Sequence, residues 1–427
     1  MALILDYHRH FTSKYQAIAR YSCNPIDTTT DGNRMAGLEF AVGVIVFVVG
    51  LTAFVALHEL GHLIPAKRFG VGVKQYMVGF GPTLFSRRVG ETEYGLKLLL
   101  LGGYISMEGM YPPKPPETEE YSKTPFFALS APKRIAIMFG GPFVNLILAV
   151  VFFLLAFCVL GAPAVGVGAV SQCTPASLTS ECQTGDPRSP AAAAGLREGD
   201  IVTRIDGRPV ASWGDLSTTI QSSAGENVVL DVSRGEKTVP LEVQIGSISD
   251  GAGGEIGFFG MTPSTVLVPQ SLGQGFVTIG QTISQNVSAF ASLPVSVMNA
   301  GRSIFTGEER SAESPLSMVG VGRAAGVISS SEAISPDVKV QTFLTIMGSV
   351  NLALFILNMV PLPPFDGGHI AVALWQSLRD FIAKRRGQPT RGPIDVSKLI
   401  PVTLTVFAVL VGLTLVMTVA DIVNPII

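Results

Sequence analysis

The five residues His58-Glu59-Leu60-Gly61-His62 form the clearest chemical pattern in this chain of 427 residues. On a helix, side chains at positions i and i+4 lie on one face, so both imidazoles can bind one zinc ion. Glu59 then lies close enough to hold and deprotonate a zinc-bound water, whose pKa the metal lowers to about 7. The spacing therefore predicts a zinc hydrolase. The alternative is a pair of histidines at a helix end with no metal.

Catalytic zinc needs a third protein ligand and one open position. His8 and His10 lie in an N-terminal tail of doubtful origin, which leaves the segment Asn-Met-Val-Pro-Leu-Pro-Pro-Phe-Asp-Gly-Gly-His at 358–369. Its prolines stop a helix, and we expect its two glycines to free the backbone after Asp366. Both Asp366 and His369 are possible ligands, and spacing alone does not choose between them. An ordinary loop at a helix end is the alternative.

Four apolar stretches surround these motifs. A bilayer core needs about 20 apolar residues of helix, so each stretch can span a membrane, and in lipid each must be helical. The first stretch runs directly into the His-Glu-His set, and the third runs into the proline-rich segment. Ionisable side chains cost free energy when they lie in or at the end of a membrane helix, so a functional site is the default interpretation. The four stretches are 40–57, 135–162, 343–362 and 400–420.

The composition excludes several classes of protein. Hydrophobic residues make up 47% and charged residues 15%, whereas soluble domains carry about 25% charged residues. This composition therefore argues against a wholly soluble globular protein. A net charge of -2 leaves no basic footprint for nucleic acid. Four cysteines are too few for a disulfide-dense secreted scaffold.

Lysine and arginine orient the spans, because loops rich in these residues stay in the cytoplasm. The loops at 70–134 and 371–399 are basic and should be cytoplasmic, which places 163–342 and both termini outside. The tail at 1–35 is also basic and fits this orientation poorly. We expect it to be either a disordered tail or a mis-assigned start, with Met35 as the true first residue.

The two motifs together resemble the site-2 protease family of intramembrane zinc metalloproteases. That family pairs H-E-x-x-H with a distant N-x-x-P-x-P-x-x-D-G, which this chain matches at Asn358, Pro361, Pro363, Asp366 and Gly367. The resemblance implies that one Zn²⁺ per chain is bound by two histidines and an aspartate, with a glutamate as base and His369 as a neighbour only. It also implies that Asn358 lines the site and contacts the substrate or the oxyanion, with Pro361 beside it. The implied ligands are His58, His62 and Asp366, and the implied base is Glu59.

Two further segments resemble parts of the same family. Residues 78–107 are similar to its membrane-associated β-hairpin, in which 96–101 would supply a strand with a free edge. A substrate could pair with that edge near Leu98, Gly102 and Gly103; a plain cytoplasmic hairpin is the alternative. Residues 140–145 resemble the G-P-x-x-N at the start of the second span. Asn145 would bond broken backbone near the site, or make a simple interhelical hydrogen bond.

Residues 163–262 predict one soluble β-rich domain. Short β-branched runs at 200–205, 228–232 and 239–245 alternate with turn residues and two short helices. The run from Ser189 to Gly207 resembles bacterial PDZ domains, which bind extended peptide tails by strand addition. Just before it, Cys173 and Cys182 could form a disulfide in an oxidising compartment or remain two reduced thiols. Cys158 lies in a span and should only pack. The following region, 263–342, is amphipathic, and its residues 269–306 predict an amphipathic helix.

The predicted fold is therefore an α-helical polytopic membrane protein with four transmembrane helices, a membrane-associated β-hairpin and one extracytoplasmic PDZ domain. It would lie in the cell membrane and cleave a single-pass membrane protein, such as an anti-sigma factor, after another protease has trimmed it. A trimmed tail or extended peptide would bind the PDZ domain. A non-enzymatic scaffold, in which Glu59 is dispensable, and a metal transporter are the competing classes. The expected segments are 1–35, 36–69, 70–134, 135–162, 163–262, 263–342, 343–370, 371–399 and 400–424.

Overall fold

The computed structural model describes residues 30–426 apart from 111–120, 176–179, 181, 184, 236, 250–253, 309, 311–313, 390–393 and 395. Most of the predicted N-terminal tail, including His8 and His10, lies outside the described residues. The last part of that tail does not: the first described helix, α3, begins at Thr30. The part of α3 that is apolar enough to span a membrane begins at Met35, so the helix starts a few residues before the expected span.

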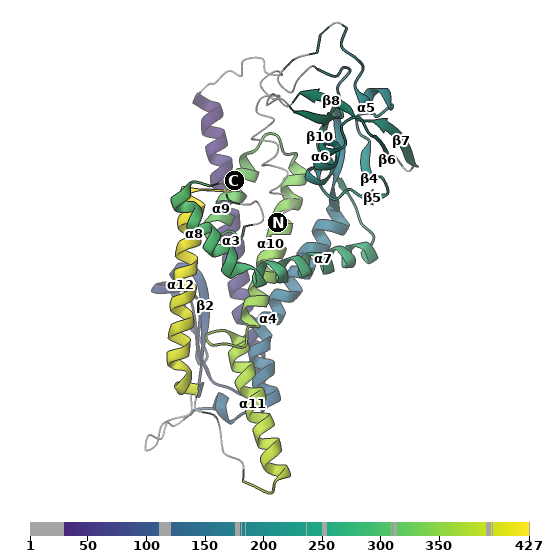
Figure 1. Ribbon diagram of the computed structural model, residues 1–427. Coiled ribbons are helices and arrows are strands. Elements are labelled where there is room, and N and C mark those ends of the chain that lie inside the picture. Colours follow the sequence, from purple (N-terminus) through teal and green to yellow (C-terminus); the bar gives the residue numbers. More distant parts are fainter. Residues whose placement is uncertain are drawn as a thin grey trace.

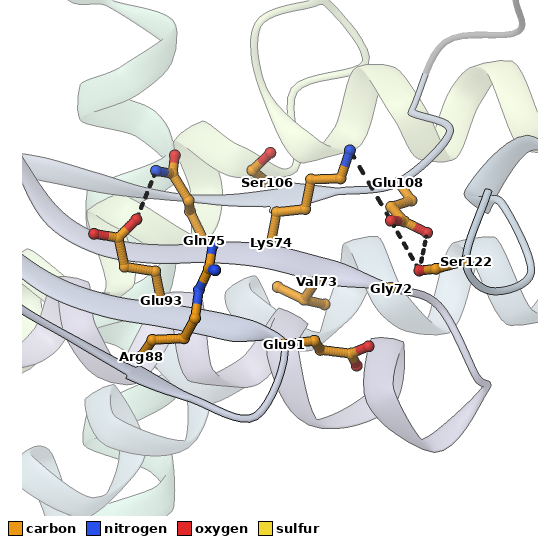
Figure 2. A pocket seen from close by; sticks show the side chains of 10 residues that line it. All are labelled: Gly72, Val73, Lys74, Gln75, Arg88, Glu91, Glu93, Ser106, Glu108 and Ser122. Carbon is orange, nitrogen blue, oxygen red and sulfur yellow. Dashed lines mark hydrogen bonds and ion pairs between the residues drawn. The ribbon is translucent and has the colours of Figure 1, made fainter. Parts of the chain in front are cut away.

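Four of the described helices are long and apolar enough to cross a membrane, as the sequence predicts. They run side by side, with a β-rich unit at one end and α11 at the other (Figure 1). Their apolar faces need lipid or protein contact because the windows are only partly buried within the chain. The four are α3 (Thr30–Arg68), α4 (Ala131–Leu154) continued by the π-helix η2 (Leu155–Gly161), α10 (Pro336–Asn358) and α12 (Ile400–Val423).

The third span ends earlier than predicted. The proline-rich segment stops α10 at Asn358, and a new helix, α11, starts at Asp366 and runs to Arg385. Two expectations are thus wrong: a span continuing to 370, and a basic loop beginning at 371. The carboxylate in the first turn of α11 and the two cations in its last turn, Lys384 and Arg385, complement the helix dipole.

Between the first two spans lies a sheet made from two long, bent strands, β1 (Val73–Val89) and β2 (Thr92–Met107). The start of β1 pairs with both arms of β2, so Val78 pairs with Leu96 and also with Gly103. Leu96 pairs on its other side with Phe85. The expectation of a free edge along 96–101 is therefore wrong at Leu96. The short helix η1 (Phe126–Ala128) follows the sheet.

The β-rich unit has the strand order β10-β3-β4-β6-β7, with β5 beside β4 and a separate β8–β9 pair. Its core includes Val202, Leu216 and Leu230. Gly195 ends the first short helix with φ +77°, in the left-handed conformation that its position predicts. A disulfide joins Cys173 and Cys182. The elements are β3 (Ala162–Val170), α5 (Pro190–Ala193), β4 (Ile201–Ile205), β5 (Arg208–Pro209), α6 (Trp213–Ser222), β6 (Asn227–Arg234), β7 (Lys237–Gln244), β8 (Gly246–Ser249), β9 (Glu255–Phe258) and β10 (Met261–Val268).

The β-rich unit is joined to the second span without a linker. The π-helix ends at Gly161 and β3 begins at the next residue. Strand β10 pairs with β3 along its length, from Met261 opposite Val170 to Val268 opposite Ala162. The unit expected to end at 262 therefore extends to 268, because β10 is the partner of its first strand.

Three helices follow the β-rich unit, and the first two lie where one amphipathic helix was expected at 269–306. Ser292 and the proline after Leu293 divide the apolar pattern into α7 (Leu272–Ala291) and α8 (Leu293–Thr306). The third, α9 (Met318–Ser330), packs on α3 and shares a buried cluster with it and α10. The short helix η3 (Val396–Leu399) precedes the last span.

Candidate metal centre

The two histidines of the first motif lie one turn apart on α3, near its C-terminal end. Their Nε2 atoms are 3.2 Å apart, and their ring centroids are 4.8 Å apart. Asp366, at the start of α11, completes the group: its Oδ2 lies 3.4 Å from Nε2 of His58 and 3.3 Å from Nε2 of His62. The described residues place no other set of three histidine, cysteine or acidic side chains this close.

These distances fit a zinc ion. Zinc bound tetrahedrally at about 2.0–2.2 Å holds its ligand atoms roughly 3.3–3.6 Å apart, and the three observed separations are 3.2, 3.3 and 3.4 Å. The buried Oδ2 of Asp366 makes no hydrogen bond, which leaves a charged oxygen for a cation to satisfy. His369, which spacing alone could not exclude as a ligand, is outside this group.

A second set of contacts orients the two imidazoles. The backbone carbonyl of Ile137 lies 2.8 Å from Nδ1 of His62. This carbonyl can only accept, so Nδ1 carries the proton and Nε2 is free to bind metal. Nδ1 of His58 lies 3.0 Å from the side-chain amide of Asn145. The amide nitrogen faces the ring and the buried Oδ1 has no hydrogen-bond partner. In the opposite amide orientation Oδ1 would accept a hydrogen bond from Nδ1–H.

Asn145 therefore contacts a candidate ligand histidine rather than broken backbone. Of the two roles considered for it, the interhelical hydrogen bond is the one that the structure shows, and its partner is His58. The sequence could not reveal this partner, because it depends on how α3 and α4 cross.

Glycines make that crossing close. A Cβ on Gly61 would lie 2.4 Å from the carbonyl oxygen of Gly140, and one on Gly140 would lie 2.0 Å from that of Gly61. A Cβ on Gly141 would lie 2.3 Å from Nε2 of His62. Small residues let membrane helices approach closely, and here the approach brings the α4 contacts within reach of α3. In the sequence, the pair Gly140-Gly141 within an otherwise apolar span was the signal that could have predicted this close helix crossing.

Glu59 is 8% exposed and faces the bent sheet. A Cβ on Gly103 would lie 3.0 Å from Cγ of Glu59, so the sheet passes in contact with this side chain. A Cβ on Gly102 would instead meet the Phe80 ring at 2.7 Å, and Leu98 is exposed farther along the strand. Of the three substrate-contact positions expected in the sheet, Gly103 is the one that lies against Glu59.

The proline-rich segment packs tightly against the start of α11. Cβ atoms on Gly367 and Gly368 would lie 2.5 Å from Val360 O and 2.7 Å from Leu362 C, respectively. The glycines are helical, and their role is this close approach; the expectation that they free the backbone is wrong. Asn358 donates its amide to the Leu354 carbonyl at 3.0 Å, and Pro361 is exposed.

Comparison with known proteins places this arrangement in a family. A profile of peptidase family M50 matches residues 46–400, a range that includes all three candidate ligands. The chain belongs to this family. Zinc metalloprotease Rip1 of Mycobacterium tuberculosis is 33% identical over 410 residues, covering 91% of this chain and 98% of that protein. Rip1 of Mycolicibacterium smegmatis is 30% identical, covering 90% and 98%. RasP of Shouchella clausii is 23% identical, covering 78% and 90%.

The M50 chain is thus a zinc metalloprotease of the site-2 type. His58, His62 and Asp366 could hold its zinc. A bound zinc would supply a Lewis acid for a peptide carbonyl and acidify a water. Its four apolar helices indicate a multi-pass membrane protein.

Proposed function

We propose that this M50 peptidase is an intramembrane zinc endopeptidase that cuts the transmembrane segment of a single-pass membrane protein. The proposal rests on where the ligand triangle, formed by His58, His62 and Asp366, lies in the fold. His58 and His62 belong to a helix that can span a membrane, and Asp366 lies eight residues after the end of another, Pro336–Asn358. A hydrolytic centre among spans can reach a peptide bond that is itself within the bilayer.

Glu59 is proposed as the general base. It is one residue from His58, buried, and the only acidic side chain in the sequence between the two ligand histidines. Its carboxylate would take a proton from water acidified at the metal and pass it to the leaving amine. Asn358 and Pro361, at the end of α10, would contact the substrate or the developing oxyanion.

The bent sheet is proposed to hold the substrate in extended form. Peptide hydrolysis requires an unwound backbone, and a strand edge can bind an unwound segment by main-chain hydrogen bonds. Gly103 puts this edge against Glu59. Gly102 and Leu98 would continue the contact, away from the base. Exposed apolar side chains on the same sheet, among them Phe80, Leu84 and Phe85, suit a membrane-associated position.

The β-rich unit is proposed to be an extracytoplasmic PDZ domain. Basic loops lie at the α11 end of the spans and the unit lies at the other end (Figure 1), which agrees with the orientation that the basic loops predict. The paired strands β3 and β10 hold the unit directly on the second span. In that place it would admit a trimmed substrate and exclude one with a bulky external domain. An anti-sigma factor trimmed by another protease is the proposed substrate.

Docking of a peptide tail on this domain would need a free strand edge. The two outer strands of the main sheet each contain a proline, Pro240 in β7 and Pro263 in β10, and proline weakens strand addition. Between β9 and α6 the gap is closed, since a Cβ on Gly257 would lie 1.8 Å from the Ile220 carbonyl oxygen. These contacts favour the role of a filter over that of a tail-binding site.

The filter can be tested without disturbing the spans. Val170 and Met261 are paired at the far end of β3 and β10, so an Asn-Gly turn can replace residues 171–260 and close the hairpin. We expect this variant to cleave an untrimmed single-pass substrate faster than the parent does, and a trimmed one at the same rate. A folded, zinc-loaded variant that no longer cleaves trimmed substrate would show that the domain is an essential docking site.

A further inference from the structure

The bent sheet is fastened to α3 at two points. The Tyr76 hydroxyl donates a hydrogen bond to the Ala56 carbonyl of α3, at 2.5 Å, and Lys67 donates one to the Tyr94 hydroxyl, at 2.8 Å. Eleven residues make about three helical turns, so Ala56 and Lys67 lie on one face of α3, roughly 16 Å apart. Glu59 lies between them on that face, three residues after Ala56.

The two fastening tyrosines are in contact with each other. Their ring centroids are 5.5 Å apart, with the planes tilted by 42°. Both rings also pack against the buried cluster that contains Ile137, whose carbonyl orients His62. The sheet, α3 and the Ile137 carbonyl of α4 are thus joined through one set of contacts.

The sheet lies against Glu59 at Gly103, whose pairing partner is two residues from Tyr76. Val78 pairs with Gly103 across the sheet, and Gly103 has room for no side chain against Val55 and Glu59 of α3. The distance between the strand and the Glu59 carboxylate therefore depends on how firmly Tyr76 holds the sheet on the helix. Burial, with the nearby charge of Glu59, raises the pKa of Tyr76 to about 12, so its hydroxyl stays a donor at neutral pH.

We propose that Tyr76, supported by Tyr94 and Lys67, is a positioning residue for peptide hydrolysis that sets the distance between the substrate-holding strand and Glu59. The inference rests on the proposed roles of Glu59 and of the strand at Gly103. A displacement of about 1 Å between reacting groups can lower a rate roughly a hundredfold. A sheet held at two points on one helix face resists such displacement.

The test compares Tyr76→Phe with the parent on a membrane-embedded, trimmed substrate in detergent or vesicles. The substitution removes one hydrogen bond and keeps the ring, so we expect full zinc content, an unchanged KM and a kcat about two- to tenfold lower. Amide hydrogen exchange in strand 73–78 should become faster. Tyr104→Phe is the matched control, because the Tyr104 hydroxyl reaches Gln75 within the sheet, at 3.3 Å, and not α3.

Tyr94→Phe should lower kcat as well, and the double variant should lose less than the product of the two single losses, because the two tyrosines act together. A kcat per bound zinc at the parent level in Tyr76→Phe would overturn the proposal, and so would an equal loss in Tyr104→Phe. Failure of the parent to cleave the embedded substrate would count against the proposed function instead. The two failures are therefore distinguishable.

Discussion

Nδ1 of His58 on the first span and the side-chain amide of Asn145 on the second lie 3.0 Å apart. Asn145 is 1% exposed, so bulk solvent does not reach its amide, and the His58 ring is the hydrogen-bond partner that the side chain contacts. The pair ties the geometry of the ligand triangle to the crossing of two membrane helices.

Asn145→Ala should weaken zinc binding about 10- to 100-fold, because it removes the group that fixes the ring of a ligand histidine. Asn145→Asp should bind zinc close to parent strength, since a carboxylate oxygen can accept from Nδ1–H at the same place. Zinc retention against a graded series of chelators measures both. Equal retention by the two variants would remove Asn145 from the metal centre.

Zinc content should be one ion per chain and should fall to near zero in His58→Ala, His62→Ala or Asp366→Ala. His369→Ala should keep its zinc, because His369 lies outside the ligand group. Elemental analysis of purified protein gives the ratio. Zinc lost in the His369 variant but kept in the Asp366 variant would reverse the ligand assignment.

Gly141→Ala should lower zinc affinity at least about tenfold. The added Cβ would lie 2.3 Å from Nε2 of His62 and 2.8 Å from Nε2 of His58. Either α4 or the two imidazoles must therefore shift. Gly280→Ala, on α7, is the control, because nothing lies within 4 Å of the Cβ it adds. A chelator series on the two variants should separate them clearly, and equal affinities would argue against a tightly packed site.

Much of this site follows from the sequence. The parts that could not be predicted are those that depend on contacts between distant segments. The i, i+4 spacing of His58 and His62 predicts a shared helix face, and the family motif selects Asp366. The pairing of β1 with both arms of β2 could not be read from local alternation, since Val78 pairs with two residues far from it in the chain. In the same way, the partner of Asn145 depends on a helix crossing set by Gly61 and Gly140.

The β-rich unit should lose stability in acid through Asp200. Burial alone would raise the pKa of this carboxyl, but hydrogen bonds from Arg234 and from the Arg197 backbone outweigh it and hold the pKa below its ordinary value. A lowered folded-state pKa gives stability that is present above the unfolded pKa of about 3.9 and is lost as pH falls through the folded value.

Asp200→Asn should therefore destabilise the unit by about 2 kcal/mol at pH 7 and flatten its loss of stability below pH 4. Hydrogen exchange of β4 and β6 at several pH values measures this within the whole chain. If the stability of the unit fell with pH in the same way in parent and variant, another group would control the loss of stability in acid.

The most direct test of the account is cleavage of a membrane-embedded, trimmed substrate by Glu59→Gln. Glutamine keeps the shape and can still hydrogen-bond water, but cannot accept its proton. The account predicts one zinc per chain, as in the parent, and a rate at least about a hundredfold lower. A zinc-loaded Gln variant that cleaves at the parent rate would contradict it, because the base would then have to be another group.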